Sequence, residues 1–182
     1  VAAGELKGRR LAAPKGRRTR PTSDRIRIAC LDTLAPWLPG ARFLDLFAGA
    51  GAVGIEALSR GCAECVFVET DHAAMAALCS NLEQLGLAGR ARVLRRDARS
   101  AVELLKREGA RFAAMFLDPP YRSALAAETL ARLADGTLLA PGGVVVVQHL
   151  TKAPLPERVG SLTAFKGRRF GETTLTFFRA AG

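Results

Sequence analysis

The stretch Phe43-Leu44-Asp45-Leu46-Phe47-Ala48-Gly49-Ala50-Gly51-Ala52-Val53-Gly54 decides the fold. It begins with a short apolar strand, continues through a glycine-rich turn and ends in the first residues of a helix. The glycine spacing fits the G-x-G-x-x-G pattern of nucleotide-binding α/β folds, in which the backbone approaches a ligand closely at a helix N-terminus. Taken alone, the stretch predicts a Rossmann-like nucleotide site without identifying its ligand.

Strand-like runs alternate with longer helical patterns from residue 42 onward. We expect strands at residues 42–47, 64–69, 91–96, 112–117 and 144–147, and helices at residues 52–60, 72–85, 100–108 and 125–133. Such alternation is typical of an α/β fold with a mostly parallel, Rossmann-like sheet and helices on both faces. Two further β-rich runs, at residues 162–166 and 173–179, predict an antiparallel pair that closes the sheet.

The N-terminal part of the chain is expected to lie outside this alternating core. Residues 24–37 have a helical pattern, with Thr22 or Ser23 in the position of an N-cap. Residues 4–12 are compatible with a short basic β-hairpin. We therefore divide the chain into a basic N-terminal segment, residues 1–21, and a main domain, residues 22–182.

Charge is distributed unevenly along the 182 residues, whose formal net charge is +10. Residues 1–27 contain nine basic and two acidic side chains, residues 150–182 contain six and two, and the middle of the chain is almost neutral. Basic ends on a neutral core predict a protein that grips a polyanion such as a nucleic acid. No apolar run approaches the roughly 20 residues that span a bilayer, so we expect no membrane segment.

The four cysteines and two histidines do not have the spacing of a metal site. Cys62 and Cys65 form a C-x-x-C pair, but a zinc site needs a second pair or two nearby histidines. We therefore expect reduced thiols, a cytoplasmic location and no bound metal.

Three acidic residues near the ends of predicted strands are candidates for binding a nucleoside cofactor. Asp45 precedes the glycine turn, where a carboxylate favours a cationic ligand such as one with a sulfonium and an α-amino group. Glu69 ends the second strand, in the position that binds ribose hydroxyls of NAD and S-adenosylmethionine alike. Asp97 ends the third strand and is placed to meet an adenine amino group. Their alternative roles are a turn carboxylate, a surface charge and a helix N-cap, respectively.

The run Asp118-Pro119-Pro120-Tyr121 follows the fourth predicted strand, where it is expected to face the cofactor. An exocyclic amino nitrogen of a base is planar and a poor nucleophile. A carboxylate from Asp118 and a carbonyl from Pro119 that accept its two N–H bonds would free its lone pair. Tyr121 offers a flat face on which an extruded base can stack. The run predicts an S-adenosylmethionine-dependent methyltransferase of a base amino group.

Three other interpretations remain open at this point. The same type of tetrapeptide serves DNA adenine-N6 and cytosine-N4 methyltransferases, although no segment here has the length of a DNA target-recognition region. A second alternative is a non-catalytic RNA-binding module of the same fold, which the intact Asp45, Glu69 and Asp118 disfavour. The third is a NAD-dependent dehydrogenase, which the lack of a suitably placed catalytic histidine or lysine disfavours.

The chain resembles the bacterial 16S rRNA (guanine-N2)-methyltransferase family, the small-subunit rRNA methyltransferase D type, over nearly its whole length. The shared motifs lie at residues 8–11, 20–27, 44–51, 54–61, 67–69, 116–121 and 170–175. The block Arg20-Pro21-Thr22-Ser23-Asp24-Arg25-Ile26-Arg27 is more specific than the glycine turn. Two positions depart from the pattern: Ala50 stands where serine is expected, and Gln148 stands where glutamate is expected.

This resemblance implies a class I S-adenosylmethionine-dependent methyltransferase fold with seven strands, of which the last is antiparallel. It implies that S-adenosylmethionine donates a methyl group to N2 of one guanine of 16S rRNA, leaving S-adenosylhomocysteine. The substrate would be the RNA within a 30S subunit or an assembly intermediate. We further expect a monomer.

The candidate site residues form three groups. The catalytic candidates are Asp118, Pro119 and Tyr121. The cofactor candidates are Thr22, Asp24, Asp45, Phe47, Ala48, Gly49, Gly51, Glu69, Asp97 and Ala98. Among these, Thr22 and Asp24 are carried over from the family, in which the block before the first helix closes over the methionine end of the cofactor. The candidates for RNA contact are Arg9, Arg10, Arg17, Arg18, Arg20 and Arg25.

Overall fold

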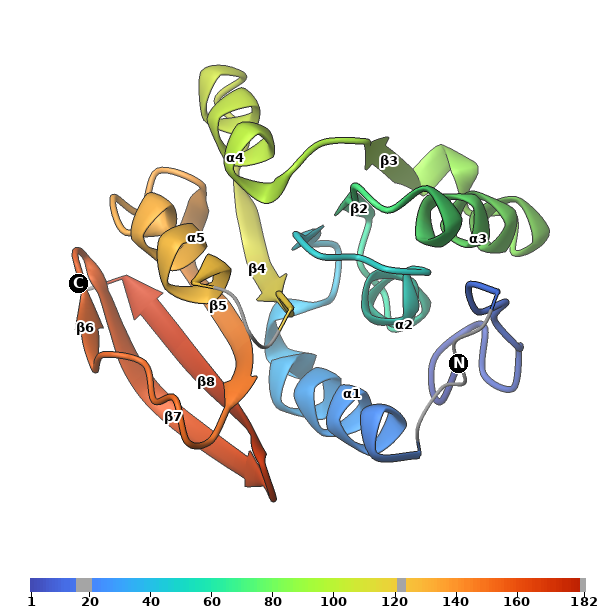
Figure 1. Cartoon of the computed structure of the whole chain (residues 1–182). Helices are drawn as coiled ribbons and strands as arrows, with labels where there is room; N and C mark the ends of the chain where they lie inside the picture. Colours follow the sequence, from blue (N-terminus) through green and yellow to red (C-terminus); the bar gives the residue numbers. More distant parts are fainter. Residues whose placement is uncertain (16–20, 121–123, 181–182) are drawn as a thin grey trace.

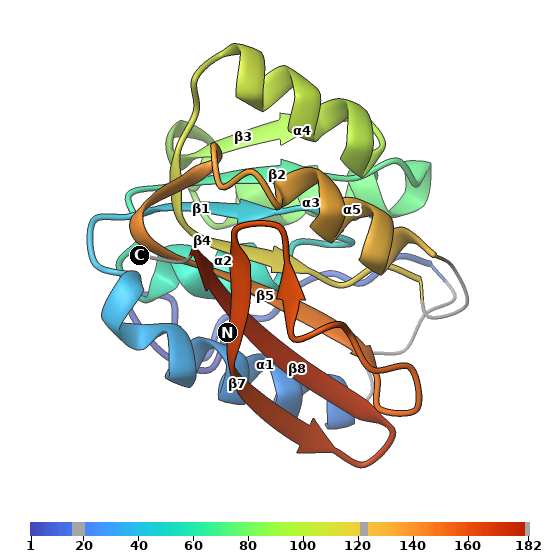
Figure 2. The same cartoon turned by 90° about the vertical axis from the view of Figure 1, so that its left-hand side faces the viewer.

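The computed structural model of the chain describes residues 1–15, 21–120 and 124–180, with the side chains of residues 21 and 22 set aside. A single sheet of eight strands forms its centre, in the order β3-β2-β1-β4-β5-β8-β7-β6. The strands are β1 (Arg42–Asp45), β2 (Glu64–Val68), β3 (Ala91–Leu94), β4 (Phe112–Leu117), β5 (Leu139–Leu150), β6 (Arg158–Val159), β7 (Leu162–Phe170) and β8 (Thr173–Ala180). Strands β1 to β5 are parallel, and β8 runs antiparallel to β5 and β7 (Figure 2). The predicted α/β fold class is confirmed.

Helices cover both faces of this sheet (Figure 1). They are α1 (Pro21–Leu34), α2 (Ala52–Ser59), α3 (His72–Gln84), α4 (Ala98–Arg107) and α5 (Leu125–Leu133), with short 3-10 turns at Ala35–Trp37 and Ala88–Arg90. Within β1, Phe43 packs with α1, α2 and α3, whereas Leu44 packs with α4 and α5. Neighbouring side chains of a strand point to opposite faces, so a strand that is covered on both sides carries apolar side chains on both, as Phe43 and Leu44 do in β1. Among the described residues, no helix is long and apolar enough to cross a membrane.

Two predicted features of the N-terminal part are wrong. Helix α1 starts at Pro21 rather than at residue 24, so Thr22 and Ser23 belong to its first turn and neither is its N-cap. Proline suits that first turn, because a helix has no partner for the N–H groups there. Residues 1–15 form turns without a strand, so the hairpin predicted at residues 4–12 is absent.

Two differences concern the sheet. β5 starts at Leu139 rather than at the expected residue 144, and it runs without interruption through Pro141, Gly142 and Gly143. Its pairing with β4 shifts register between Phe112 and Ala114. The glycines therefore form an irregularity within a strand rather than a turn before one. The eighth strand, beyond the seven expected, is the two-residue β6, which pairs with β7 at the edge of the sheet.

The N-terminal residues are fastened to α2 by two buried side chains. The backbone N–H groups of Ala2 and Ala3 donate to the Glu56 carboxylate at 3.0–3.2 Å. The Ser59 hydroxyl accepts from the Leu6 N–H at 2.9 Å and donates to the Ala3 carbonyl at 2.6 Å. Residues 1–15 are therefore packed on the sheet-and-helix core, although the sequence suggested a segment outside it.

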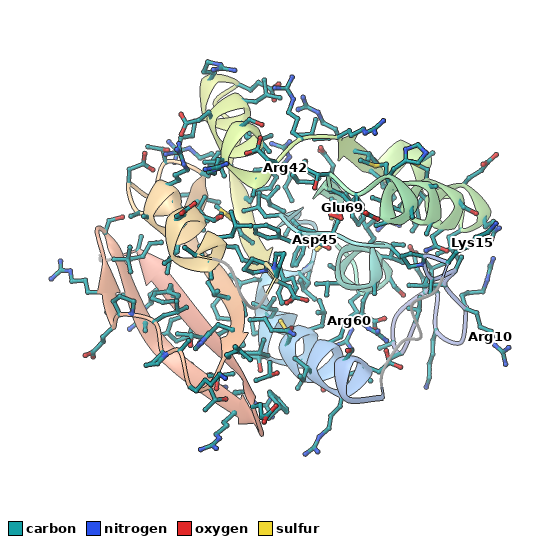
Figure 3. The ribbon with its side chains drawn as sticks, in the orientation of Figure 1. Arg10, Lys15, Arg42, Asp45, Arg60 and Glu69 are labelled. Carbon is teal, nitrogen blue, oxygen red and sulfur yellow. The ribbon has the colours of Figure 1, made fainter. Side chains whose placement is uncertain are left out.

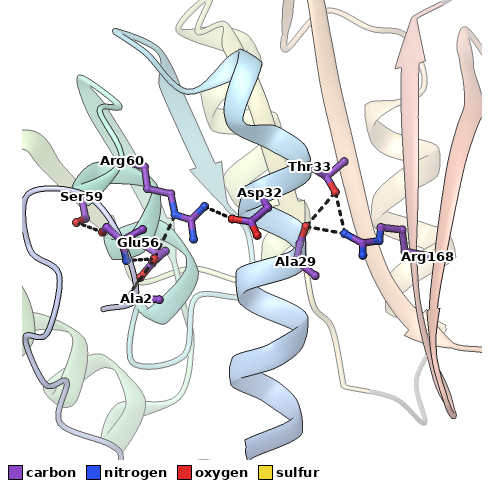
Figure 4. Close-up of polar contacts among 9 residues, drawn as sticks. Ala2, Ala29, Asp32, Thr33, Glu56, Ser59, Arg60 and Arg168 are labelled. Carbon is purple, nitrogen blue, oxygen red and sulfur yellow. Dashed lines mark hydrogen bonds and ion pairs between the residues drawn. The ribbon is translucent and has the colours of Figure 1, made fainter.

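A chain of polar contacts extends from this attachment across the molecule (Figure 4). Arg60 bridges the carboxylates of Glu56 and Asp32, at 3.2 and 2.7 Å, and so joins α2 to α1. On the other side of α1, the Arg168 guanidinium donates to the Ala29 carbonyl at 3.3 Å. These contacts hold α1 in place between α2 and β7, and the first turn of α1 borders the cavity described next.

Candidate active site

A cavity of about 730 Å³ opens where the parallel strands end. Its walls come mainly from residues that follow β1, β2, β3 and β4, including Phe47, Gly49, Glu69, Asp97, Ala98, Asp118 and Pro119. The strand order reverses between β1 and β4, which is where ligands bind in open α/β sheets. The volume lies within the range of about 300–1,000 Å³ that is usual for sites of small ligands. This cavity is therefore the candidate active site.

Three glycines shape the turn after β1 for different reasons. Gly49 has a φ of +58° and borders the cavity, and a Cβ there would meet no atom within 4 Å. Gly51 precedes α2 with a φ of +92°. A Cβ on Gly54 would lie only 2.3 Å from the Phe67 ring, so glycine is what allows α2 to pack on β2. The G-x-G-x-x-G spacing thus has three causes: Gly49 leaves room for a ligand, Gly51 allows the turn, and Gly54 allows α2 to pack on β2.

Asp45 lies at the end of β1, buried beneath this turn rather than in the cavity wall (Figure 3). Its Oδ2 accepts from the Gly54 N–H at 3.2 Å, whereas its Oδ1 has no hydrogen-bond partner within the described residues. Burial, together with the carboxylates of Asp118 and Glu69, raises the pKa of Asp45 to about 7. Asp45 thus supports the turn from below, and its direct contact with a cofactor stays a prediction.

Glu69 follows β2 and lies half-buried in the cavity wall (Figure 3). Burial raises the pKa of its carboxyl group, while hydrogen bonds from the backbone N–H groups of Asp71, Thr70 and Gly49 lower it. Asp71, two residues further on, caps α3 by accepting from the Ala74 N–H at 2.8 Å. The carboxylate of Glu69 is therefore oriented by the backbone on the cavity side of β2.

Asp97 follows β3 and is both a helix cap and a cavity residue. Its Oδ1 accepts from the Ser100 N–H at 3.0 Å and its Oδ2 from the Ser100 hydroxyl at 2.9 Å, and both contacts lower the pKa of Asp97. Ala98, the first residue of α4, lies beside it in the wall. The N-cap role that the sequence left open is confirmed, and the cap explains why α4 starts two residues earlier than predicted.

Asp118 and Pro119 follow β4 and line the cavity together. Burial raises the pKa of Asp118 to about 7, which marks the carboxyl group as a functional candidate. Pro119 is buried and also borders a second cavity of about 180 Å³. Tyr121 lies outside the described residues, so its stacking role stays a prediction.

The remaining cofactor candidates that the structure describes do not line the cavity. Ala48 and Gly51 lie behind the wall, where the Ala48 N–H donates to the Val68 carbonyl at 3.0 Å and its carbonyl accepts from the Gly51 N–H at 2.9 Å. Asp24 forms an ion pair with Arg27 at 2.7 Å and borders a different surface hollow. The side chain of Thr22 is not among those described.

Ser23, the next residue of the block, lines the cavity. Asp71 and Arg96 are wall residues as well, and none of these three was predicted from the sequence. Each is adjacent to, or two residues from, a residue that was identified. Their signal in the sequence is therefore this proximity to the residues that follow the strands.

Three of the six candidates for RNA contact are described, and they lie apart from the cavity. Arg9 and Arg10 are exposed on the N-terminal segment, and Arg10 points outward at the edge of the molecule (Figure 3). Arg25 is exposed on α1, with its guanidinium 5.9 Å from the centre of the Phe170 ring. Arg17, Arg18 and Arg20 fall outside the described residues.

Known proteins resemble the chain in sequence and in structure. A family model described as Conserved hypothetical protein 95 matches residues 1–179. The chain belongs to this family. One relative, the Ribosomal RNA small subunit methyltransferase D of Escherichia coli (strain K12), is 38% identical over 156 residues, which cover 86% of this chain and 77% of the relative. The resemblance to the small-subunit rRNA methyltransferase D type is thereby confirmed.

Solved structures agree with this assignment. The hypothetical protein TTHA0928 of Thermus thermophilus is 37% identical, with a TM-score of 0.82 over 97% of this chain and 96% of that one. The SAM-dependent methyltransferase from Agrobacterium tumefaciens is 16% identical, with a TM-score of 0.67 over 88% of this chain and 62% of that one. The latter likeness concerns the fold alone. The chain has the class I methyltransferase fold, and it is a methyltransferase of this family.

Proposed function

We propose that the chain transfers a methyl group from S-adenosylmethionine to the exocyclic N2 of a guanine in 16S rRNA. It is an S-adenosylmethionine-dependent methyltransferase by family and by fold. One observation carries the choice of an amino group: Asp118 and Pro119 stand together in the cavity wall at the end of β4.

The residues of the cavity fit S-adenosylmethionine. Glu69, Asp97 and Ala98 line the cavity. Glu69 would bind the ribose hydroxyls, and the N-terminus of α4, at Asp97 and Ala98, would meet the adenine ring. The carboxylates that border or underlie the cavity favour a ligand that carries a sulfonium and an ammonium group. Among them, the buried Oδ1 of Asp45 has no hydrogen-bond partner within the described residues. When bound, S-adenosylmethionine supplies an electrophilic methyl group.

The chain's own residues would prepare the accepting nitrogen. The Asp118 carboxylate and the Pro119 carbonyl would each accept one N–H of the amino group, which draws the nitrogen away from planarity. Two consecutive prolines restrict the backbone there, so little ordering is needed when the base arrives. A strong general base is unnecessary, because the nitrogen loses its proton readily once it is methylated. Pro119 faces the small second cavity as well, which supplies apolar space beside the reacting group.

The RNA target is inferred from charge and from the relatives. The basic side chains gather at the two ends of the chain, and Arg9, Arg10 and Arg25 are exposed. Such side chains suit phosphate contacts, as would those of Arg17, Arg18 and Arg20. The Escherichia coli relative is named for ribosomal RNA of the small subunit. The choice of guanine N2 rests on the family likeness, since Asp-Pro-Pro-Tyr serves several bases.

The context of the reaction follows from this target. A small-subunit rRNA is available in the cytoplasm as naked RNA, as an assembly intermediate and as a finished 30S subunit. We place the reaction in one of the last two states and expect a monomeric enzyme.

Side-by-side methyl transfer tests this proposal. Labelled S-adenosylmethionine would be incubated with the protein and either 30S particles that lack the modification, naked 16S rRNA or duplex DNA. We expect label in the particles, released by digestion as N2-methylguanosine. Label only in DNA, or on adenine or cytosine, would contradict the proposal.

A further inference from the structure

Asn81 is a buried polar residue of α3 whose side chain is fully used in hydrogen bonds. It is 1% exposed and lies beside the glycine turn. Its Oδ1 accepts from the Ala12 N–H at 2.7 Å, and its Nδ2 donates to the Ala12 carbonyl and to the Ala50 carbonyl, both at 3.0 Å. One side chain thus joins α3, the N-terminal segment and the turn after β1.

The contact with Ala50 fixes the least constrained peptide of that turn. Ala50 stands between Gly49 and Gly51, whose φ angles of +58° and +92° belong to a region that glycine enters freely. The Gly51 N–H donates to the Ala48 carbonyl at 2.9 Å, on one side of the Ala50–Gly51 peptide. Asn81 holds the carbonyl of the same peptide on the other side. With both ends held, the peptide has one orientation.

The contacts with Ala12 orient Asn81 itself. A carboxamide can be turned by 180° about its last bond, which exchanges its oxygen and nitrogen. Because Ala12 offers an N–H and a carbonyl to the same amide group, only one of the two orientations satisfies both. In that orientation the second hydrogen of Nδ2 is directed at Ala50. The N-terminal segment therefore determines how Asn81 meets the turn.

We propose that Asn81 is a positioning residue for the cofactor, which keeps the Gly49–Gly51 turn in its binding conformation without touching the ligand. This inference rests on the proposed cofactor site, because Gly49 is the part of the turn that lines the cavity. Asparagine is required because it alone combines an acceptor for Ala12 with donors for two carbonyls at this length. Aspartate would direct a carboxylate at the carbonyls of Ala12 and Ala50.

The test compares Asn81→Asp and Asn81→Ala with a matched control, Ser59→Ala. Ser59 also binds the N-terminal segment by two hydrogen bonds, but both of them lie on the segment and neither involves the turn. Binding of S-adenosylhomocysteine would be measured by calorimetry on the full chain, together with the melting temperature of each variant. Because this assay contains no RNA, it does not depend on which base or polymer is methylated.

We expect both Asn81 variants to bind S-adenosylhomocysteine about tenfold more weakly, since a carbonyl of the turn loses its buried partner. Ser59→Ala should lower the melting temperature while it changes the dissociation constant less than about twofold. In methyl transfer, the Asn81 variants should raise the KM for S-adenosylmethionine and leave kcat close to the original.

Two outcomes would overturn the inference. One is wild-type affinity in Asn81→Ala, which would make Asn81 a purely structural residue. The other is equal weakening by Ser59→Ala, which would attribute the effect to general loosening of the N-terminal segment. Asn81→Ala introduces no buried charge and decides the matter if Asn81→Asp does not fold. Absence of any S-adenosylhomocysteine binding by the wild-type protein would instead contradict the proposed cofactor.

Discussion

Replacing Asp45 with asparagine should stabilise the ligand-free protein at alkaline pH. The pKa of Asp45 is raised from 3.8 to about 7, chiefly by burial. The folded protein therefore retains a proton that the unfolded chain releases, and the free energy of unfolding falls as pH rises from about 4 to about 7. A shift of about three pKa units corresponds to about 4 kcal/mol above pH 7. Asparagine avoids this cost and can still accept the Gly54 N–H.

We expect a gain of about 2–4 kcal/mol for Asp45→Asn at pH 8, because asparagine is never ionised, whereas its buried amide N–H groups need a partner that the carboxylate did not. For a chain of this size, that gain corresponds to a melting temperature higher by roughly 4–16 °C. The gain should shrink steadily toward pH 5 and nearly vanish near pH 4. Calorimetric melting of both proteins at pH 5, 6, 7 and 8 measures it.

Asp97→Asn is the control of opposite sign. The pKa of Asp97 is lowered by its contacts with Ser100, so its carboxylate adds stability at neutral pH that is lost as the pH falls below about 4. This variant should melt at a lower temperature than wild type at pH 7. An Asp45→Asn variant that is less stable than wild type at pH 8, or whose gain does not depend on pH, would refute the account of Asp45.

Three further predictions concern other parts of the molecule. Glu56→Ala should cost about 3–5 kcal/mol of stability in urea titrations, because Arg60 and two backbone N–H groups lose a buried partner; a loss below about 1 kcal/mol would count against it. Gly54→Ala should cost about 1–3 kcal/mol in the same assay, since its Cβ would meet Phe67, and an unchanged protein would speak against this packing. The double variant Arg9→Gln and Arg10→Gln should weaken RNA binding and make it depend less on salt. The slope of log K against log salt concentration should fall by about 0.7–0.9 for each phosphate that is no longer neutralised. An unchanged slope would mean that the RNA binds at another surface.

The alternating core could be predicted from sequence because its signals are local. β4 and α5 have the predicted bounds, Phe112–Leu117 and Leu125–Leu133, and the other elements of the parallel sheet were located to within a few residues. β5 was the exception. Its residues 141–143 have the composition of a turn, and they belong to the strand because β5 pairs with β4 on both sides of them, at Leu139 and again from Val144.

The N-terminal segment could not be predicted, because its conformation depends on partners far along the chain. Its turns are held by Glu56, Ser59 and Asn81, which lie more than 50 residues away in sequence. Asn81 itself is recognisable in the sequence by its position. It is a polar residue on the same helical face as Leu78 and Leu85, where an apolar side chain is the usual occupant.

The candidate site likewise contains residues whose positions follow from the local sequence and residues whose positions depend on packing between distant segments. Strand-end positions identified Glu69, Asp97 and Asp118 as cavity residues, because parallel strands end at one edge of the sheet. The position of Asp45 behind the turn depends on how α2 packs, and so it could not be read from spacing. Asp24 was taken from the family pattern. Ser23 lines the cavity and Asp24 borders another hollow, so a contact of Asp24 with the cofactor stays a prediction.

The central claim is that Asp118 accepts a hydrogen bond from the amino group that is methylated. The most direct test measures methyl transfer to unmodified 30S particles by Asp118→Ala and Asp118→Asn, with S-adenosylhomocysteine binding measured on the same samples. We predict a loss in rate of at least about 100-fold in both variants, with binding changed by less than about threefold. A rate within a few-fold of wild type in Asp118→Ala would contradict the account.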